Sequence, residues 1–441
     1  MNLKPYPKYK NSGIEWLGEI PEGWEVRRLK YVCNEYAEYG LNIEAENYQS
    51  EGIRFIRTTD LDDYGNLKNE GVYINPVLAK DYILKDGDLL ISRSGTIGRS
   101  FLYKSDKNEE ATYAGYLVRY SPDSEKAFPK YLFYFTLSHS FYEWLKTQLI
   151  ESTIGNVNGQ KYANIFLPIP PKEEQVRISG YLDHKTSKID ELIKKNERLI
   201  ELLKEKRQAI ISQAVTKGLE PNAKLKDSGI EWIGEIPEGW EVKRLKYIAK
   251  IILGKMLQNE NSGEDKLKPY LRAQNIQWEV VDVSDVKEMW FSDYEIKKYR
   301  LQIRDLLVSE GGEVGRTSLW DGELDECYVQ NSVHKITVND NLINNMYLLY
   351  LLETYGKRGF FEAIVSRVSI GHLTREKLKE IEIICPPKNE QDQIVTYLTQ
   401  KTSQIDNLTK NIESQIETLK EYRQTLISNV VTGKVMVGED R

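Results

Sequence analysis

The sequence has little cysteine and no long apolar run. Only Cys33, Cys327 and Cys385 occur, an odd number without a C-x-x-C spacing, so neither a disulfide framework nor a zinc knuckle is predicted. No run approaches the roughly 18 apolar residues of a membrane span, and the opening MNLKPYPKYK lacks the apolar core of a signal peptide. We therefore predict a cytoplasmic protein without membrane contact, with the three thiols in its core.

Signatures of catalysis are also missing. Residues 312–318 (GEVGRTS) lack the G-x-x-x-x-G-K-[ST] spacing of a phosphate loop, and residues 122–126 lack the acid-to-lysine spacing of a nuclease. No Ser/His/Asp arrangement stands out. The four histidines have no H-E-x-x-H spacing and are expected on the surface or on helices: His139, His184, His334 and His372. The sequence predicts a binding protein, with no metal site and no catalytic residue.

Positive charge is not in excess. The 441 residues include 61 Lys and Arg against 67 Asp and Glu, a net charge of −6. This counts against a protein that coats nucleic acid, because phosphate binding usually shows as a basic surplus, so any DNA contact must be local. The composition, 40% hydrophobic and 29% charged, is globular, and at roughly 150 residues per domain the length predicts about three units.

What the sequence does contain is an internal repeat. Residues 11–31 read NSGIEWLGEIPEGWEVRRLKY and residues 227–247 read DSGIEWIGEIPEGWEVKRLKY, identical at 18 of 21 positions. DLLISRSGTIGR at 88–99 matches DLLVSEGGEVGR at 305–316. Two half-chains therefore share one fold. Recent gene conversion is an alternative source of the identity and leaves the fold prediction untouched.

Each half reads as a mixed α/β globule followed by a long helix. β-branched and Leu runs predict strands, Gly-rich stretches predict turns, and residues 131–146 and 346–363 predict buried helices. Residues 172–217 contain no proline and one glycine, and apolar residues recur at alternating spacings of four and three, in the second copy as well. At 1.5 Å per residue such a helix of about 45 residues reaches roughly 65 Å, so the two helices are expected to pack on each other.

Two copies related by a pseudo-two-fold axis make an antiparallel pair the natural arrangement, with the C-terminus near the N-terminus. The fold class is thus α/β (mixed α+β), with two pseudo-symmetric domains and an antiparallel coiled coil. Polar Lys185 and Asn196 on the seam either fix its register or leave a solvated notch. The predicted apolar seam is Ile178, Leu182, Ile189, Leu192, Leu199, Leu203, Ile210, Ile394, Leu398, Ile405, Leu408, Ile412, Leu419 and Leu426.

Three segments of the sequence are typical of a known family: SGIEWLGEIPEGWE, LLISRSGTIGR and the PPKEEQVRI that opens the first long helix. The whole chain resembles the specificity subunit of type I restriction-modification systems. The resemblance implies target-recognition domains at 1–167 and 227–384, long helices at 168–217 and 385–433, and a linker at 218–226. It implies that the two domains read the two halves of an interrupted, asymmetric site in double-stranded DNA while the coiled coil sets the spacer.

The resemblance also implies partners. Two methylation subunits would use S-adenosylmethionine, and restriction subunits would use ATP and Mg, so no cofactor is expected in this chain. The absence of an N/D-P-P-Y/F motif and of a Walker loop agrees. The near-identical blocks at 12–31 and 228–247 either hold the common fold or dock two identical partners, whereas the divergent middles can read two different sequences.

Arg reads guanine, Asn and Gln read adenine, and Ser, Thr and Lys mainly position phosphates. In the first domain the candidates are Arg57, Thr58, Thr59, Arg93, Ser94, Thr96, Arg99, Asn156, Asn158, Gln160 and Lys161. In the second they are Arg272, Gln274, Asn275, Arg316, His372, Thr374, Arg375 and Lys377. Internal ion pairs of Arg57, Arg99, Arg272 and Arg316 stay an open alternative. Glu310-Gly311 and Glu313 replace Arg93-Ser94 and Thr96, so the two loops cannot contact phosphate in the same way.

Two other classes of protein stay open. A self-sufficient nuclease or methyltransferase would need a catalytic constellation that the sequence does not contain. A coiled-coil scaffold without base-specific reading would explain the helices, but not why paired globules share a framework and differ in their turns.

Overall fold

The computed structural model describes residues 4–68, 70–150, 155–261, 263–365 and 372–438 and contains two compact units. Unit 1 comprises residues 1–197 and 413–441, and unit 2 comprises residues 198–412. Both long helices, α5 (Lys172–Lys217) and α10 (Lys388–Val431), contribute to each unit. A unit is therefore one globule with the nearby parts of both helices, and the units do not coincide with the sequence repeats. No helix in the described ranges is long and apolar enough to cross a membrane.

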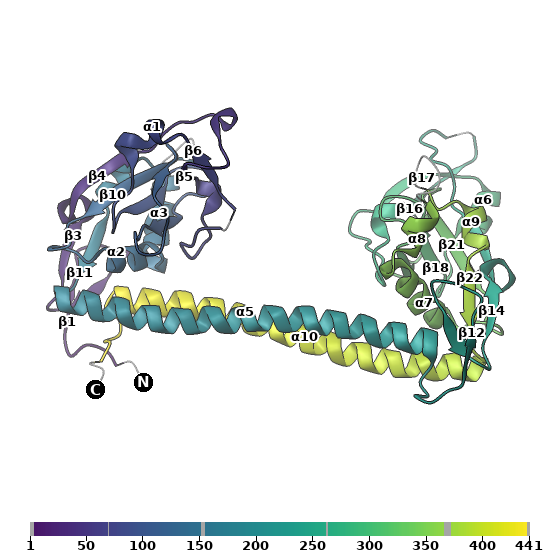
Figure 1. Ribbon diagram of the computed structural model, residues 1–441. Coiled ribbons are helices and arrows are strands. Elements are labelled where there is room, and N and C mark those ends of the chain that lie inside the picture. Colours follow the sequence, from purple (N-terminus) through teal and green to yellow (C-terminus); the bar gives the residue numbers. More distant parts are fainter. Residues whose placement is uncertain (1–3, 69, 151–154, 262, 366–371, 439–441) are drawn as a thin grey trace. The chain divides into compact units, whose positions relative to one another are not determined.

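The same four-stranded antiparallel sheet forms the centre of each globule (Figure 1). In unit 1 its order is β4 (Cys33–Tyr39), β10 (Leu117–Pro122), β7 (Leu89–Ser92), β8 (Ser100–Leu102). In unit 2 the order is β15 (Ala249–Leu253), β21 (Val333–Val338), β18 (Leu306–Ser309), β19 (Thr317–Leu319). The matching order confirms that the two half-chains share one fold.

Each globule also has a three-stranded outer sheet with one parallel and one antiparallel pairing. It consists of β6 (Val72–Ile74), β5 (Ile53–Ile56) and β9 (Ala111–Tyr113) in unit 1, and of β17 (Lys287–Phe291), β16 (Lys266–Leu271) and β20 (Tyr328–Val329) in unit 2. Two-stranded pairs complete the sheets: β1 (Tyr9–Asn11) with β2 (Glu19–Pro21), β3 (Glu25–Arg28) with β11 (Phe166–Ile169), β12 (Leu225–Asp227) with β13 (Glu235–Pro237), and β14 (Glu241–Arg244) with β22 (Glu382–Cys385).

Short helices connect these strands. The α-helices are α1 (Pro76–Ala79), α2 (Pro129–Thr136), α3 (His139–Ile150), α4 (Gly159–Ala163), α6 (Asp293–Tyr299), α7 (Asn345–Lys357), α8 (Phe360–Val365) and α9 (Arg375–Lys379). The 3-10 helices are η1 (Leu29–Val32), η2 (Ala45–Asn47), η3 (Thr58–Asp60), η4 (Lys80–Tyr82), η5 (Leu245–Tyr247) and η6 (Ala273–Asn275).

The predicted helices at 131–146 and 346–363 are buried, but each is broken in two. Between α2 and α3 the Ser138 hydroxyl donates to Phe135 O at 2.7 Å and accepts from Phe141 N at 3.2 Å, which ends one helix and begins the next. Between α7 and α8 the chain passes through Gly359 with a φ of +75°. Glycine adopts this left-handed conformation without steric penalty, so it ends α7.

Equivalent hydrogen bonds attach each globule to the long helices. The Tyr131 hydroxyl lies 2.7 Å from Pro168 O and 2.8 Å from Val431 O in unit 1. The Tyr347 hydroxyl lies 3.1 Å from both Ile384 O and Val215 O in unit 2. The near-identical blocks join in as well, because the indole nitrogens of Trp24 and Trp240 donate to Glu174 and Glu390 in the first turns of α5 and α10. The blocks therefore hold the common fold.

The two long helices run antiparallel, as predicted, and lie side by side (Figure 1). Arg423 donates to Asp190 at 2.8 Å in unit 1, and Arg207 donates to Asp406 at 3.0 Å in unit 2. Moving 17 residues forward along α5, from Asp190 to Arg207, thus moves the partner 17 residues back along α10. Near the chain ends, Met436 N donates to Lys4 O at 2.7 Å, which confirms that the C-terminus returns to the N-terminus.

The seam follows an 11-residue rather than a seven-residue repeat. Buried isoleucines recur every 11 residues, at Ile178, Ile189, Ile200 and Ile211 in α5 and at Ile394, Ile405, Ile416 and Ile427 in α10; Ile193 and Ile412 are buried as well. Eleven residues in three turns is about 3.67 per turn, close to the 3.6 of a straight helix, whereas a strict seven-residue repeat drifts by roughly 20° per heptad. The predicted positions Leu192, Leu199 and Leu408 are accordingly wrong: they are 49%, 42% and 46% exposed, and Ile193 and Ile200 are buried in their place.

The other predicted seam residues are shielded from solvent. Ile210 and Leu419 are half-buried, and the rest are buried: Ile178, Leu182, Ile189, Leu203, Ile394, Leu398, Ile405, Ile412 and Leu426.

The cysteines and one histidine complete the core. Cys33, Cys327 and Cys385 are free and buried, as predicted, and burial raises the pKa of each thiol to about 12. His334 contradicts the prediction of surface or helical histidines, because it lies fully buried in β21. Its Nε2 lies 2.6 Å from Leu373 O, and burial lowers its pKa to about 4. It is a neutral framework residue.

Candidate nucleic-acid interface

The loop between β7 and β8, residues 93–99, holds the central group of predicted contacts in unit 1. Arg93 N donates to Tyr116 O at 2.9 Å, and Arg93 O accepts from Val157 N at 3.0 Å, so the residue is fixed between two neighbouring segments. Gly98 closes the loop at a φ of +87°, where a Cβ would stand 2.5 Å from the Leu145 side chain. Only glycine fits there.

The Arg93 side chain lies over an aromatic ring. Its guanidinium carbon is 4.8 Å from the Tyr39 ring centre, and its Nε donates to Asn156 Oδ1 at 3.4 Å. No carboxylate forms an ion pair with Arg93 in the described part of the chain. Tyr39 and Tyr116 are exposed beside it. A free guanidinium, an amide and two tyrosines thus meet at one surface.

The loop between β18 and β19, residues 310–316, has the same backbone. Glu310 N donates to Ser332 O at 2.9 Å, and Glu310 O accepts from Leu373 N at 2.9 Å. Gly315 repeats the role of Gly98, since a Cβ there would stand 2.2 Å from Phe361. The two loops therefore have equivalent backbone hydrogen bonds, and Glu310 occupies the position of Arg93.

The Glu310 carboxylate is half-buried, and within the described ranges it has no cationic side chain in an ion pair. Burial raises its pKa, and His372 opposes this shift. A Cβ built on Gly311 would lie 3.4 Å from His372 Nδ1, so the imidazole is packed beside the loop. Glu313, by contrast, accepts from the Trp278 indole at 2.7 Å and is used internally.

The four framework arginines take the internal alternative. Arg57 pairs with Asp60 at 2.7 Å, Arg99 with Asp63 at 2.7 Å, and Arg272 with Asp285 at 2.8 Å. Arg316 donates to Gln277 Oε1 at 2.8 Å and Ala273 O at 3.3 Å. These side chains hold the turns that follow β5 and β16.

Two predicted contacts beside Arg272 are also engaged within unit 2. Asn275 is wrong as a DNA contact, because it is buried and its Oδ1 accepts from Arg272 N at 2.9 Å. Gln274 donates to Asp285 at 3.1 Å.

Several other candidates form helix caps. Asn158 accepts from Lys161 N at 2.9 Å at the start of α4, and Thr374 accepts from Lys377 N at 3.4 Å at the start of α9. The amino groups of Lys161 and Lys377 then donate to carbonyl oxygens of Gln148 and Ile364, each at 3.4 Å. Arg375 pairs with Glu376 at 2.9 Å.

The remaining candidates keep polar groups at the surface. Thr96 Oγ1 lies 3.5 Å from Thr58 O, which joins the β7–β8 loop to η3, and Ser94 is half-buried in the same loop. Thr59 O accepts from the Lys68 amino group at 2.7 Å. Gln160 is exposed and, with Asn158 and Lys161, lines a hollow of about 620 Å³.

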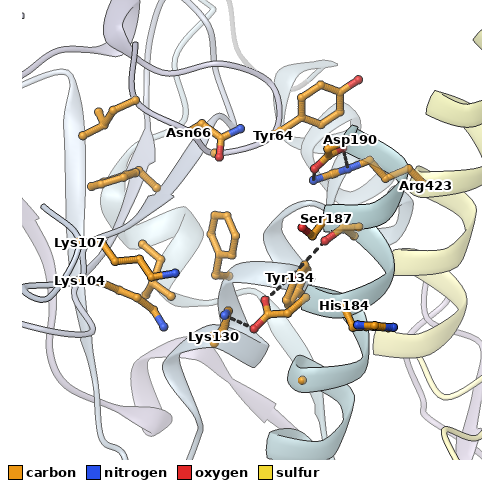
Figure 2. Close-up of a pocket in the computed structure, with 18 of the residues that line it drawn as sticks. Tyr64, Asn66, Lys104, Lys107, Lys130, Tyr134, His184, Ser187, Asp190 and Arg423 are labelled. Atoms are coloured by element: carbon orange, nitrogen blue, oxygen red, sulfur yellow. Dashed lines mark hydrogen bonds and ion pairs between the residues drawn. The ribbon is translucent and has the colours of Figure 1, made fainter. Parts of the chain in front are cut away.

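A larger cleft of about 1040 Å³ lies in unit 1 between α5 and the globule (Figure 2). Lys104 and Lys107 line one side, and the Asp190–Arg423 pair lines another. Burial, with Lys130 nearby, lowers the pKa of Lys104. Lys130 itself pairs with Asp183. Sequence reasoning missed this basic cleft, because its lysines come from separate segments without a motif.

Tyr39 and Tyr116 were missed as well, since no sequence signal separates an exposed tyrosine from the many buried ones. No group of three or more His, Cys, Asp or Glu able to hold a metal ion is found among the described residues.

Comparisons with known proteins agree with this organisation. The sequence pattern of the type I restriction modification DNA specificity domain matches residues 21–202 and again 237–418. The chain is 27% identical to the type I restriction enzyme MjaVIII specificity subunit of Methanocaldococcus jannaschii, over 95% of this chain and 94% of that protein.

Solved structures share the fold. A chain from a study of complex assembly and conformational transition in a type I R-M system superimposes with a TM-score of 0.71 at 19% identity, covering 93% of this chain and 98% of that one. The HsdS subunit from Thermoanaerobacter tengcongensis gives a TM-score of 0.53 at 18% identity, covering 94% and 98%. Because the two matches of the family pattern together cover most of the chain, the chain belongs to the DNA specificity subunits of type I restriction-modification systems, non-catalytic components of those complexes.

Proposed function

We propose that each unit reads one half of a bipartite, asymmetric site in double-stranded DNA. One observation carries this proposal: the β7–β8 and β18–β19 loops have the same backbone hydrogen bonds but present Arg93 with Asn156 in unit 1 and Glu310 with His372 in unit 2. Equal geometry with different side chains is the arrangement expected of two readers with different targets.

Methylation and restriction subunits would supply the chemistry. Two copies of a methylation subunit, using S-adenosylmethionine, fit a chain whose two framework blocks are nearly identical, and restriction subunits would use ATP and Mg. Exposed leucines on the long helices support docking of a partner: Leu192 in unit 1, and Leu199, Leu202 and Leu408 in unit 2. The chain itself would need no cofactor and would work in the cytoplasm, where its DNA lies.

The net charge of −6 gives little electrostatic steering toward DNA. We therefore expect weak binding by the chain alone and tight binding once two methylation subunits complete the complex. In this assembly the length of the paired helices sets the spacer between the two half-sites.

The test is a domain exchange in cells that carry this chain with its methylation partner. Residues 54–161 are replaced by the same region of a homologue, and methylated sites are mapped by methylation-sensitive sequencing. One half-site should change and the other should stay. A simultaneous change in both halves would overturn the two-reader proposal, and an unchanged motif would leave the chain as a scaffold whose partners read the DNA.

A further inference from the structure

This inference rests on the proposed function. We infer that Arg93, held in place by Asn156, donates hydrogen bonds to a guanine. At the equivalent position of the other loop, Glu310, which lies beside His372, accepts a hydrogen bond from the amino group of a cytosine. The pairs are equivalent in the repeat, since Arg93 aligns with Glu310 and Asn156 with His372. The backbone N–H and C=O groups of Arg93 and of Glu310 also make equivalent hydrogen bonds.

The Arg93 side chain is prepared for a base rather than for an internal acid. Its Nε donates to Asn156 Oδ1 at 3.4 Å and its guanidinium carbon lies 4.8 Å from the Tyr39 ring centre, which leaves the two terminal nitrogens as paired donors. Guanine presents two acceptors, N7 and O6, side by side in the major groove, and a guanidinium matches them bidentately. A phosphate would also accept these donors, so the test must separate the two.

The Glu310 carboxylate has fewer possible partners on DNA than the Arg93 guanidinium. A carboxylate is repelled by phosphate, and in the major groove only the amino groups of cytosine and adenine offer a donor. Adenine places the N7 acceptor beside its amino group, which would face the second carboxylate oxygen, whereas cytosine has no acceptor beside N4. The half-buried carboxylate, without an internal cation in the described ranges, therefore fits cytosine.

Glu313 provides a matched control in the same loop. It carries the same charge and is exposed, but its carboxylate accepts from Trp278 Nε1 at 2.7 Å and lies 4.0 Å from Arg316 Nε. A glutamine at position 313 can still accept from the indole. E313Q should therefore leave the recognised sequence unchanged, although it removes one negative charge, as E310Q does.

The experiment maps methylated sites in cells that carry the methylation partner with wild-type chain, E310Q, E313Q or R93Q. E310Q should relax one position of the unit 2 half-site from cytosine toward adenine, since a glutamine reads adenine, with about a 10- to 100-fold loss of discrimination. R93Q should relax one guanine of the other half-site. E310Q that keeps the wild-type motif, or that loses methylation uniformly at all sites, would overturn the inference.

A second measurement needs no variant. The wild-type complex is offered DNA in which 7-deazaguanine replaces the guanine, or pyrimidin-2-one, which lacks the amino group, replaces the cytosine. Each analogue should weaken binding about 10-fold or more at one position of one half-site, and equal binding would overturn the assignment. If wild-type cells show no bipartite motif, the proposed function fails; if they show one that neither the variants nor the analogues alter, only this inference fails.

Discussion

The two units use equivalent arginines on the paired helices in different surroundings. In unit 2, Arg207 donates to both oxygens of Glu279, at 2.8 and 2.7 Å, and lies near Glu353 as well as pairing with Asp406. The side chains of Arg207 and Glu353 are buried or nearly so, and acids surround the arginine. The junction between helices and globule is thereby joined by charge.

In unit 1 the equivalent Arg423 has Asp190 as its only ion-pair partner among the described residues, and its guanidinium carbon lies 4.4 Å from the Tyr64 ring centre. The junction there is an open cleft of about 1040 Å³. The contacts made by Tyr131 and Tyr347, by contrast, are the same in both units. After duplication, the attachment to the helices has been kept while the outer parts of the globules have changed. This is the division expected when the helices fix the geometry and the outer parts read the DNA.

The largest effect should come from lengthening both helices between the units. Insertion of four residues after Asn196 and four after Ile412 adds about 6 Å and turns each helix by about 40°, so the seam should survive with some strain. Because base pairs rise about 3.4 Å along the duplex, methylated sites should gain one or two spacer base pairs while both half-sites stay unchanged. Sequencing of methylated DNA measures this, and activity at the original spacer would mean that the partner subunits set the distance.

The two arginines should differ in their contribution to stability. R207A leaves the Glu279 carboxylate without its cation, and because this pair is largely removed from water the loss should be about 3 kcal/mol, the lower end of the range for a buried pair. Arg423 is buried as well, but R423A leaves only Asp190, whose side chain is 41% exposed and stays hydrated, so a smaller loss than in R207A is expected.

Hydrogen exchange of the full-length chain measures the two units separately. Exchange in unit 2 should accelerate strongly in R207A, and exchange in unit 1 only weakly in R423A. R198A, on the exposed side of α5, is the control for loss of an arginine. Equal effects of R207A and R423A would show that the acids around Arg207 do not hold the junction.

The attachment of the globules was predictable, whereas the outer parts were not. A 21-residue block repeated nearly unchanged, and a proline-free segment of helical periodicity, are local signals, and α5 spans the proline-free residues 172–217. The burial of Asn275 and His334 depends on the tertiary packing around them. Arg57 pairs with Asp60 only three residues away, but the sequence alone could not decide between this internal pair and a DNA contact. The seam was misplaced because seven-residue and 11-residue repeats differ by only a few degrees per residue.

A pH dependence between about pH 6.5 and 8 should appear in unit 2. Burial and the neighbouring Glu279 raise the pKa of Glu353 to about 8, although Arg207 and Lys357 oppose this, and unit 1 has Leu137 at the equivalent place. Between about pH 6.5 and 8 the folded chain holds the Glu353 proton that the unfolded chain has released, whereas below pH 6.5 the lowered pKa of His334 acts in the opposite direction. The free energy of unfolding of unit 2 should therefore fall as pH rises, by at most about 1.4 kcal/mol per pH unit.

E353Q tests this because its neutral amide keeps the shape of the protonated acid. Its stability should be nearly flat across the same window, so that it exceeds the wild type most at pH 8. Urea unfolding at several pH values, with hydrogen exchange to assign the unit, provides the measurement. Parallel pH profiles for wild type and E353Q would show that Glu353 is ionised in the folded chain.

The smallest effects should come from the exposed leucines, and they test the 11-residue seam in both units. L192S in unit 1 and L199S in unit 2 should change the free energy of unfolding by less than about 0.5 kcal/mol, as surface substitutions do. Their buried neighbours are the matched comparison, since I193A and I200A should each cost about 2 to 4 kcal/mol. Assembly with the methylation subunit, measured by titration, should be weakened by L192S and L199S if the leucines dock a partner. A leucine variant as unstable as its isoleucine neighbour would instead return the leucines to the seam.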